Sequence, residues 1–247
     1  MSELQFSFGE MIAEIESFSY LASKFIALGS QHVLPRYKST LQSYRDQPDQ
    51  GVLQWHIPSF DPLKTIVSEG EYESGKKRGS HRVVAEIDAL WEIQRIPAKK
   101  KKASAIHFKL AGIASTRVRL FCEASDVRRE IGMWRMEIGD SSSPGCHFHV
   151  QILGEDAQAP FPKSLSIPRL PGIIITPMAV TEFVLAEIFQ KQWPEHIGYD
   201  TPHLRRWAPI QRRRLNNLLE WNLGLLDEGG SPWTTIKQSK PDVGLFL

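Results

Sequence analysis

The sequence predicts an α+β fold, in which an antiparallel sheet of about five strands carries helices on its apolar face. Apolar residues recur at helical spacing over 1–50 and again over 176–228, whereas apolar and polar residues alternate over 81–155. Short connections join the alternating segments, and short connections favour antiparallel pairing. With 247 residues, of which 41% are hydrophobic, the chain can bury one core, so we expect a single domain over 1–247.

Composition narrows the classes of function. A formal net charge of +2 does not indicate an obligatory nucleic-acid binder or an acidic tail. No apolar run reaches the roughly 18 residues of a membrane span, and the first residues lack the pattern of a secretory signal. We therefore expect a cytoplasmic protein with no membrane partner. Its two cysteines, Cys122 and Cys146, are then expected to be reduced.

Two helices are predicted before residue 50. Ser7 and Glu10 have the spacing of a capping box, and apolar residues follow them at helical intervals until Gly29. A second, more polar helix is predicted over 30–44, with an interruption at Pro35.

An irregular connection and then a hairpin are expected next. Prolines, glycines and charged residues are mixed over 54–80, which favours an irregular connection. Strict alternation over 83–94 predicts a long strand with one buried face. The lysines at 99–102 are expected at the tip of the hairpin that follows.

Four further strands complete the predicted sheet. Alternation predicts strands over 106–110, 118–122 and 131–138, with a turn at 112–115 between the first two. The segment 147–153 is expected to be the fifth and last strand.

Helices return after the sheet. Four prolines make 159–171 an extended loop, and Thr176 is a favourable N-cap for a helix that ends near Trp193. A leucine-rich helix is predicted over 209–226. The apolar tail 243–247 is expected to dock on its own domain, because exposed apolar patches are usually avoided.

The strand over 147–153 reads His-Phe-His-Val-Gln-Ile-Leu. Successive side chains of a strand point to opposite faces, so His147, His149 and Gln151 project from the same side. We expect this row on the polar face of the sheet. The open question is whether that face is a pocket or an exposed surface.

These seven residues resemble the motif of the histidine-triad superfamily, especially the branch that includes galactose-1-phosphate uridylyltransferases. That motif is histidine, apolar, histidine, apolar, glutamine, apolar, apolar, and all seven positions agree. The resemblance implies nucleotidyl or phosphoryl transfer, or hydrolysis, with His149 as the nucleophile and Gln151 holding a phosphoryl oxygen. It also implies that His147 orients the substrate and that the loop at 141–145 supplies backbone donors.

Two other interpretations of the same row stay open. In the first, the histidines lie on the solvent-exposed face of the sheet, have no chemical role and pair with charges on neighbouring strands. Alternatively, His147 and His149 would bind zinc, for which His107, or else Glu86 or Asp88 on the same face, would be the third ligand. No other cofactor is expected.

Basic and aromatic residues gather in two clusters near the end of the sequence: Arg205, Arg206, Trp207, Arg212, Arg213 and Arg214. Guanidinium groups bind phosphates and indoles stack on bases, so the clusters suggest a phosphate-binding or nucleic-acid surface. The alternative is an ordinary solvated helix face, because Glu220 and Asp227 balance the charge of the region.

Taken together, the sequence favours an accessory protein that binds a protein partner through its polar sheet face or its C-terminal region. A prokaryotic defence system is one setting for such a role. The first alternative is the histidine-dependent transferase or hydrolase. The second is a protein that binds nucleic acid or nucleotide through the arginine and tryptophan clusters.

Overall fold

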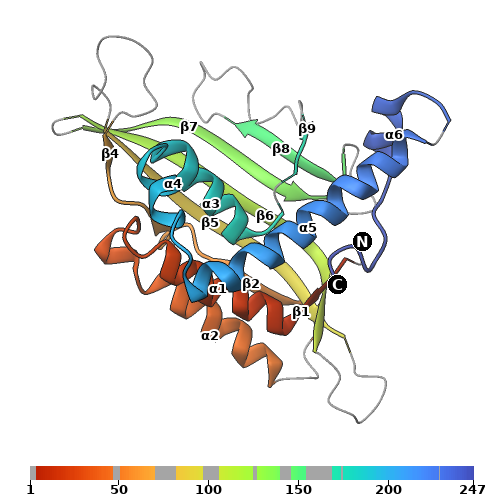
Figure 1. Cartoon of the computed structure of the whole chain (residues 1–247), viewed down its shortest axis with the longest axis horizontal. Helices are drawn as coiled ribbons and strands as arrows, with labels where there is room; N and C mark the ends of the chain where they lie inside the picture. Colours follow the sequence, from red (N-terminus) through yellow and green to blue (C-terminus); the bar gives the residue numbers. More distant parts are fainter. Residues whose placement is uncertain are drawn as a thin grey trace.

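A computed structural model shows an α+β fold, as predicted, in which one face of an antiparallel sheet packs against helices (Figure 1). The structure describes residues 4–46, 51–69, 82–96, 106–124, 127–139, 146–153, 169–173, 175–227 and 229–247.

Six antiparallel strands form the continuous path of the sheet among the described residues. In spatial order they are β2 (Leu53–Ile57), β5 (Arg82–Arg95), β6 (His107–Ala124), β7 (Val127–Ile138), β8 (Phe148–Leu153) and β9 (Arg169–Pro171). Three short strands add to it: β1 (Gln5–Ser7) pairs with β6, while β3 (Leu63–Lys64) and β4 (Ser68–Glu69) pair with β5. The predicted strands over 83–94, 131–138 and 147–153 are therefore confirmed as β5, β7 and β8.

The prediction of an irregular connection over 54–80 was wrong for the part that the structure describes. It contains β2, β3 and β4, each paired with β5, while residues 70–81 lie outside the described ranges. Strands of two residues are too short to show alternation. Pairing with β5, and not local propensity, creates β3 and β4. β2 instead alternates buried and exposed residues over its five positions, a pattern that the prediction missed.

The predicted turn at 112–115 was also wrong, because β6 runs through it without a break. Gly112 instead accompanies a β-bulge, where the pairing of β5 with β6 shifts register between Trp91 and Ile93. The side chain of Glu92 folds over Gly112 and accepts a hydrogen bond from the Ile113 N–H at 2.9 Å. A Cβ atom at position 112 would lie only 2.0 Å from the Glu92 carboxylate, so a larger residue would have to displace the end of the Glu92 side chain. The predicted hairpin tip at 99–102 lies outside the described residues.

β8 is not the last strand, because β9 pairs with it on the far side. The predicted proline-rich loop over 159–171 therefore ends in a short strand. Residues 154–168 lie outside the described part of the chain.

The helices are α1 (Phe8–Leu21), α2 (Val33–Arg45), α3 (Pro177–Ile188), α4 (Gln192–Ile197), α5 (Pro202–Leu226) and α6 (Pro232–Gln238), with a 3₁₀ turn η1 (Leu28–Ser30). α1 begins where predicted, but it ends at Leu21, and the Ser7 side chain makes no cap hydrogen bond. Glu10, the expected partner in the capping box, instead accepts a hydrogen bond from Arg213 at 2.6 Å. Pro35 does not interrupt α2, because it lies in the first turn, where its missing N–H is not needed.

Thr176 caps α3 as predicted, since its hydroxyl accepts a hydrogen bond from the Ala179 N–H at 3.2 Å. The final long helix begins earlier than predicted: Thr201 caps α5, and Pro209 lies inside it. The separate short helices α4 and α6 were not predicted.

The core lies between the sheet and the helical layer of α1, α2, α3 and α5 (Figure 1). The tail docks in this core as predicted, because Phe246 is fully buried against Phe6 and Phe148. The N–H of Gln5 also donates to the carbonyl of Val243 at 3.0 Å. Among the described residues, no helix combines the length and the apolar character needed to cross a membrane.

Candidate functional site

The histidine row lies on the face of the sheet that points away from the helices. His149 is opposite Glu137 and Gln151 is opposite Arg135 on the neighbouring strand β7. His147, His149 and Gln151 are only 4%, 3% and 4% exposed. The three side chains are therefore buried, and the expectation that they lie on a solvent-exposed face is wrong.

Hydrogen bonds tie this row to β7. The Arg135 guanidinium donates from Nη2 to Gln151 Oε1 at 2.7 Å, and its Nε lies 2.9 Å from Glu137 Oε1. The other carboxylate oxygen of Glu137 lies 3.2 Å from His149 Nε2. Arg135, Glu137, His149 and Gln151 thus form one connected polar network, which we call the β7–β8 network.

Both nitrogens of the His149 ring face oxygen atoms. Nδ1 lies 2.8 Å from the carbonyl oxygen of Cys146, and Nε2 faces Glu137. The ring therefore links the Cys146 carbonyl, just before β8, to the Glu137 carboxylate of β7, and it joins the two strands.

The histidine-triad resemblance stays a prediction. His147 precedes the first residue of β8, and the loop at 141–145 that would supply phosphate donors lies outside the described residues.

The third zinc ligand is not brought near the other two. His107 opens β6, and Ser115 on the same strand is the residue opposite Glu137. Eight residues of strand separate these two positions, a distance of roughly 25 Å at 3.3 Å per residue. No three His, Cys, Asp or Glu side chains group around a metal position within the described ranges. Cys122 and Cys146 are buried free thiols.

The arginine and tryptophan clusters do not form a continuous basic surface. Arg205 pairs with Asp200 at 2.9 Å and Arg206 lies 3.9 Å from Glu16. Trp207 is buried, so its indole cannot stack on a base.

The three consecutive arginines also differ from one another. Arg213 pairs with Glu10, and the buried Arg214 pairs with Glu14 at 2.7 Å. Arg212 is exposed and forms no ion pair with any described residue.

Charged side chains extend the outer face toward β5. Glu86 is buried, and its carboxylate lies 2.6 Å from Arg128 and 3.0 Å from both Arg119 and Lys64. Burial alone would raise the pKa of Glu86, but these cations hold the pKa below its ordinary value. The buried Glu86 carboxylate therefore has three cationic partners.

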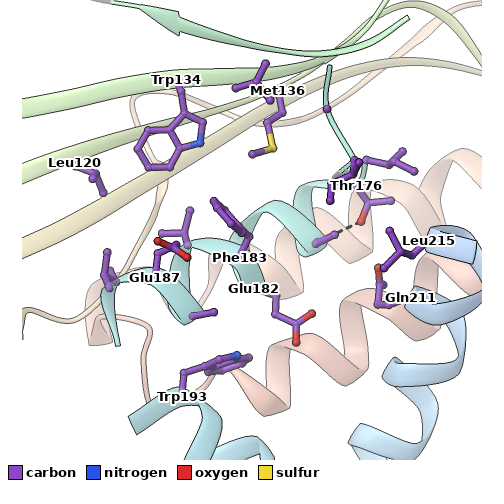
Figure 2. A pocket seen from close by; sticks show the side chains of 18 of the residues that line it. Leu120, Trp134, Met136, Thr176, Glu182, Phe183, Glu187, Trp193, Gln211 and Leu215 are labelled. Atoms are coloured by element: carbon purple, nitrogen blue, oxygen red, sulfur yellow. Dashed lines mark hydrogen bonds between the residues drawn. The ribbon is translucent and has the colours of Figure 1, made fainter. Parts of the chain in front are cut away.

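On the other face of the same strands, a large apolar cavity separates the sheet from the helices. Its volume is about 1180 Å³. Trp134 and Met136 of β7 face Phe183 of α3 across it, and Leu120 and Trp193 lie toward one end (Figure 2). The volume is that of a site for a small molecule of substantial size.

The rim of the cavity carries large apolar side chains that are between 39% and 56% exposed. They are Ile131, Ile152, Leu170, Ile173, Phe183 and Leu215. Soluble proteins seldom expose so many neighbouring apolar groups without a use for them. Sequence reasoning missed this site because it assigned residues such as Trp134 and Ile152 to an ordinary core.

Most polar groups of the cavity gather at the end near α5. Thr176, Glu182 and Gln211 approach one another there (Figure 2), and Arg212 and Arg214 also line it. The Arg214 Nε and Nη2 atoms are buried and have no hydrogen-bond acceptor among the described residues, since Glu10 is 3.9 Å from Nη2. The Arg214 guanidinium is held near Glu14, Glu10 and the ring of Phe6, so Arg212 is the exposed guanidinium that this end offers to a ligand.

Two acids lie at this end: Glu182, which lines the cavity, and the buried Glu14 of α1, which accepts hydrogen bonds from Thr176, Gln211 and Arg214. Burial raises the pKa of the Glu182 carboxyl, and the charge of Glu14 acts in the same direction, although the indole N–H of Trp207, 2.9 Å away, has the opposite effect.

No known protein family, curated protein or solved structure matches this chain.

Proposed function

We propose that the chain is a binding protein whose site is the apolar cavity between β7–β8 and α3. Its ligand would be an amphipathic molecule with an extended hydrocarbon body and a carboxylate head, of the long-chain fatty acid class. The observation that carries the proposal is a cavity of about 1180 Å³ lined by apolar side chains, with arginine donors at one end.

The apolar lining supports a hydrocarbon body. Burial of each methylene group contributes about 0.8 kcal/mol, so about ten methylenes contribute about 8 kcal/mol before the cost of association. The lining offers few hydrogen-bonding groups away from the α5 end, which disfavours a ligand with polar groups along its length.

The α5 end supports an anionic head. Arginine binds carboxylates through paired N–H donors, and Arg212 is an exposed guanidinium without an ion pair in the described part of the chain. Arg214 lies on the same wall, with its guanidinium held by Glu14. A carboxylate beside Arg212 would pair with a guanidinium that has no ion pair among the described residues.

The other functions expected from the sequence receive less support from the geometry. A transferase would need to break the Glu137–His149 pair to free its nucleophile. A nucleic-acid surface would need arginines that are instead paired with acids of α1. Binding of a protein partner stays a prediction, and the exposed rim of the cavity is compatible with it.

A fluorescence titration with cis-parinaric acid tests the proposal. We expect about one equivalent to bind with a micromolar Kd and to be displaced by palmitate. Ile152→Asp places a charge on the rim and should weaken binding at least tenfold, whereas Phe60→Asp, at a residue that is 88% exposed and outside the cavity, should not. Failure of the wild-type protein to bind would overturn the proposal.

The head group is tested by comparing palmitate with hexadecanol as competitors. The wild-type protein should prefer the carboxylate, and Arg212→Gln should remove most of that preference without weakening hexadecanol. Arg205→Gln is the matched control, because Arg205 lies on the same helix but outside the cavity lining. Equal preference in wild type and Arg212→Gln would contradict the assignment of the head.

A further inference from the structure

Glu182 of α3 is a partly buried acid that lines the polar end of the cavity. Its Oε2 atom accepts a hydrogen bond from the Trp207 indole N–H at 2.9 Å, which ties the carboxylate to α5. The described residues provide no other hydrogen bond and no ion pair to this carboxylate. In the described part of the chain, its Oε1 atom is therefore available to a ligand that enters the cavity.

The charged groups around Glu182 come from three helices. On α1, Glu14 is already paired with Arg214 of α5 at 2.7 Å. Arg212, also on α5, lines the same end of the cavity. On α3 itself, Glu187 lies toward the other end (Figure 2). The lining residues from the strands and from α4 carry no charge. Of the two acids at the polar end, Glu182 is thus the one without a cation of its own among the described residues.

A ligand carboxylate at this end brings a second negative charge close to Glu182. Two carboxylates that share an apolar site repel each other, so one of them takes up a proton. Burial already raises the pKa of Glu182, and the charge of Glu14 adds to this effect. Once protonated, the Glu182 carboxyl becomes a hydrogen-bond donor, and a ligand carboxylate is a strong acceptor for it.

We infer that the ligand carboxylate is held from two sides, by the Arg212 guanidinium and by the O–H of protonated Glu182. This inference rests on the proposed function, because it assumes the carboxylate head. The proton comes from solvent, so each bound ligand takes up one proton wherever Glu182 is ionised in the free protein. The pair of carboxylates then keeps one negative charge, which Arg212 balances. Glu182 thus makes binding of a carboxylate weaker as the pH rises.

The pH dependence of binding tests this inference by isothermal titration calorimetry with dodecanoate and dodecanol. Uptake of one proton per ligand raises the Kd by up to about tenfold per pH unit. We expect the wild-type Kd for dodecanoate to rise at least about fivefold from pH 6 to pH 8. The free ligand stays ionised over this range, because an ordinary carboxyl has a pKa of about 4.3. Dodecanol has no carboxylate, so its Kd should stay nearly constant. A Kd for dodecanoate that does not change with pH would overturn the inference.

Substitutions of Glu182 identify the group that takes up the proton. In Glu182→Gln the amide oxygen can still accept the Trp207 N–H, and the amide N–H₂ donates to the ligand without any proton uptake. This variant should lose the pH dependence and bind dodecanoate at pH 8 at least about threefold more tightly than the wild type. Glu182→Ala should also lose the pH dependence, but it should bind dodecanoate at pH 6 more weakly than the wild type, because it has no donor.

Glu187→Gln is the matched control, since Glu187 lines the cavity from the same helix but toward the other end (Figure 2). It should keep the wild-type pH profile. Circular dichroism confirms that each variant is folded. A pH profile in Glu182→Gln equal to that of the wild type, or loss of the profile in Glu187→Gln, would overturn the assignment to Glu182.

The proposed function and this inference can be told apart when they fail. A wild-type protein that binds neither dodecanoate nor dodecanol overturns the proposed function, and the inference with it. A protein that binds both ligands at pH 6 and pH 8 with unchanged affinities overturns only the inference.

Discussion

The two faces of the sheet at β7 and β8 use alternate residues of the same strands, yet they differ in what their side chains contact. On the outer face, Arg135, Glu137, His149 and Gln151 bind one another in the β7–β8 network. On the inner face, residues such as Trp134 border a cavity of about 1180 Å³. The polar side chains of the outer face have partners on neighbouring strands, although the Nε atoms of Arg119 and Arg135 make no hydrogen bond among the described residues, whereas the apolar side chains of the inner face border unfilled space.

This difference indicates where free energy for binding is available. A buried polar group costs free energy unless it has a partner, and the network supplies those partners. Apolar surface that faces water costs about 25 cal/mol of free energy per Å² relative to buried surface. A ligand that covers the surface recovers this free energy. Histidines suggest a functional site in a sequence because they take part in catalysis and metal binding. In this protein, the apolar residues next to them in the same strands border the unfilled cavity.

The largest effect should come from breaking the charge cluster of the outer face. Glu86→Ala leaves Lys64, Arg119 and Arg128 without their shared carboxylate, so it should lower the free energy of unfolding by about 2–3 kcal/mol. Urea denaturation measures the loss. Glu187→Ala is the control, because Glu187 is exposed and forms no ion pair within the described ranges, and it should change stability by less than about 0.5 kcal/mol.

The pH dependence of the same variant follows from the lowered pKa of Glu86. The native carboxylate releases its proton more readily than the unfolded one, so its stabilising effect is complete above the unfolded pKa of about 4.3. That effect is lost as the pH falls through the lower native pKa. The stability difference between wild type and Glu86→Ala should therefore shrink below about pH 4. A difference that grows in acid would contradict this sign.

Substitution of alanine by leucine at a packed position and at a cavity position compares two parts of the inner face by their effect on stability. Ala85 is fully buried in the core, so Ala85→Leu should cost about 2 kcal/mol through overpacking. Ala179 lines the cavity, and Ala179→Leu should change stability by less than about 0.5 kcal/mol because space is present. The second variant should also weaken binding of cis-parinaric acid. Equal losses of stability in both variants would show that the cavity is not open space in solution.

His149→Ala tests whether the β7–β8 network is structural. It removes one partner of Glu137 and the ring that faces the Cys146 carbonyl, so it should cost about 1–2 kcal/mol of stability in thermal or urea unfolding. Binding in the cavity on the other face should not change. Turnover of nucleotides or nucleotide sugars by the wild type, lost in this variant, would instead support the histidine-triad interpretation.

The smallest effect concerns Glu182 at the polar end of the cavity. Burial raises the pKa of this carboxyl, so the native state retains its proton to a higher pH than the unfolded state. Stability is then lost as the pH rises from the unfolded pKa through the raised native pKa. Glu182→Gln cannot titrate, and it should stabilise the protein at pH 7 by about 1 kcal/mol or less and have almost no effect near pH 4. A larger benefit at pH 4 than at pH 7 would contradict this.

Sequence periodicity predicted the long strands and the capped helices, because each repeats one pattern over many residues. The alternation over 83–94 identified β5, and Thr176 identified the start of α3. The same reasoning missed β3 and β4, which are too short for any period, and it read Gly112 as a turn instead of a bulge. These features depend on the neighbouring strand.

The site was less predictable than the fold. Alternation placed His149 and Gln151 on one face, but their burial depends on Arg135 and Glu137, which only the register of β7 with β8 brings opposite them. The cavity depends on how far α3 stands from the sheet, which no local pattern in the sequence specifies. Local patterns assign a side chain to a face, whereas tertiary packing decides whether anything covers it.

The pairing of β6 has a consequence for how fast the chain folds. At its beginning β6 pairs with β1, about 100 residues earlier in sequence, and further along it pairs with the adjacent hairpin strand β7. Pairing of β6 with β1 closes this long loop, and the chain loses conformational entropy before the contacts between the two strands can compensate for it. The β6–β7 hairpin should therefore form early, and the addition of β1 should be among the slow steps, on the millisecond to second timescale typical of sheets with distant pairings.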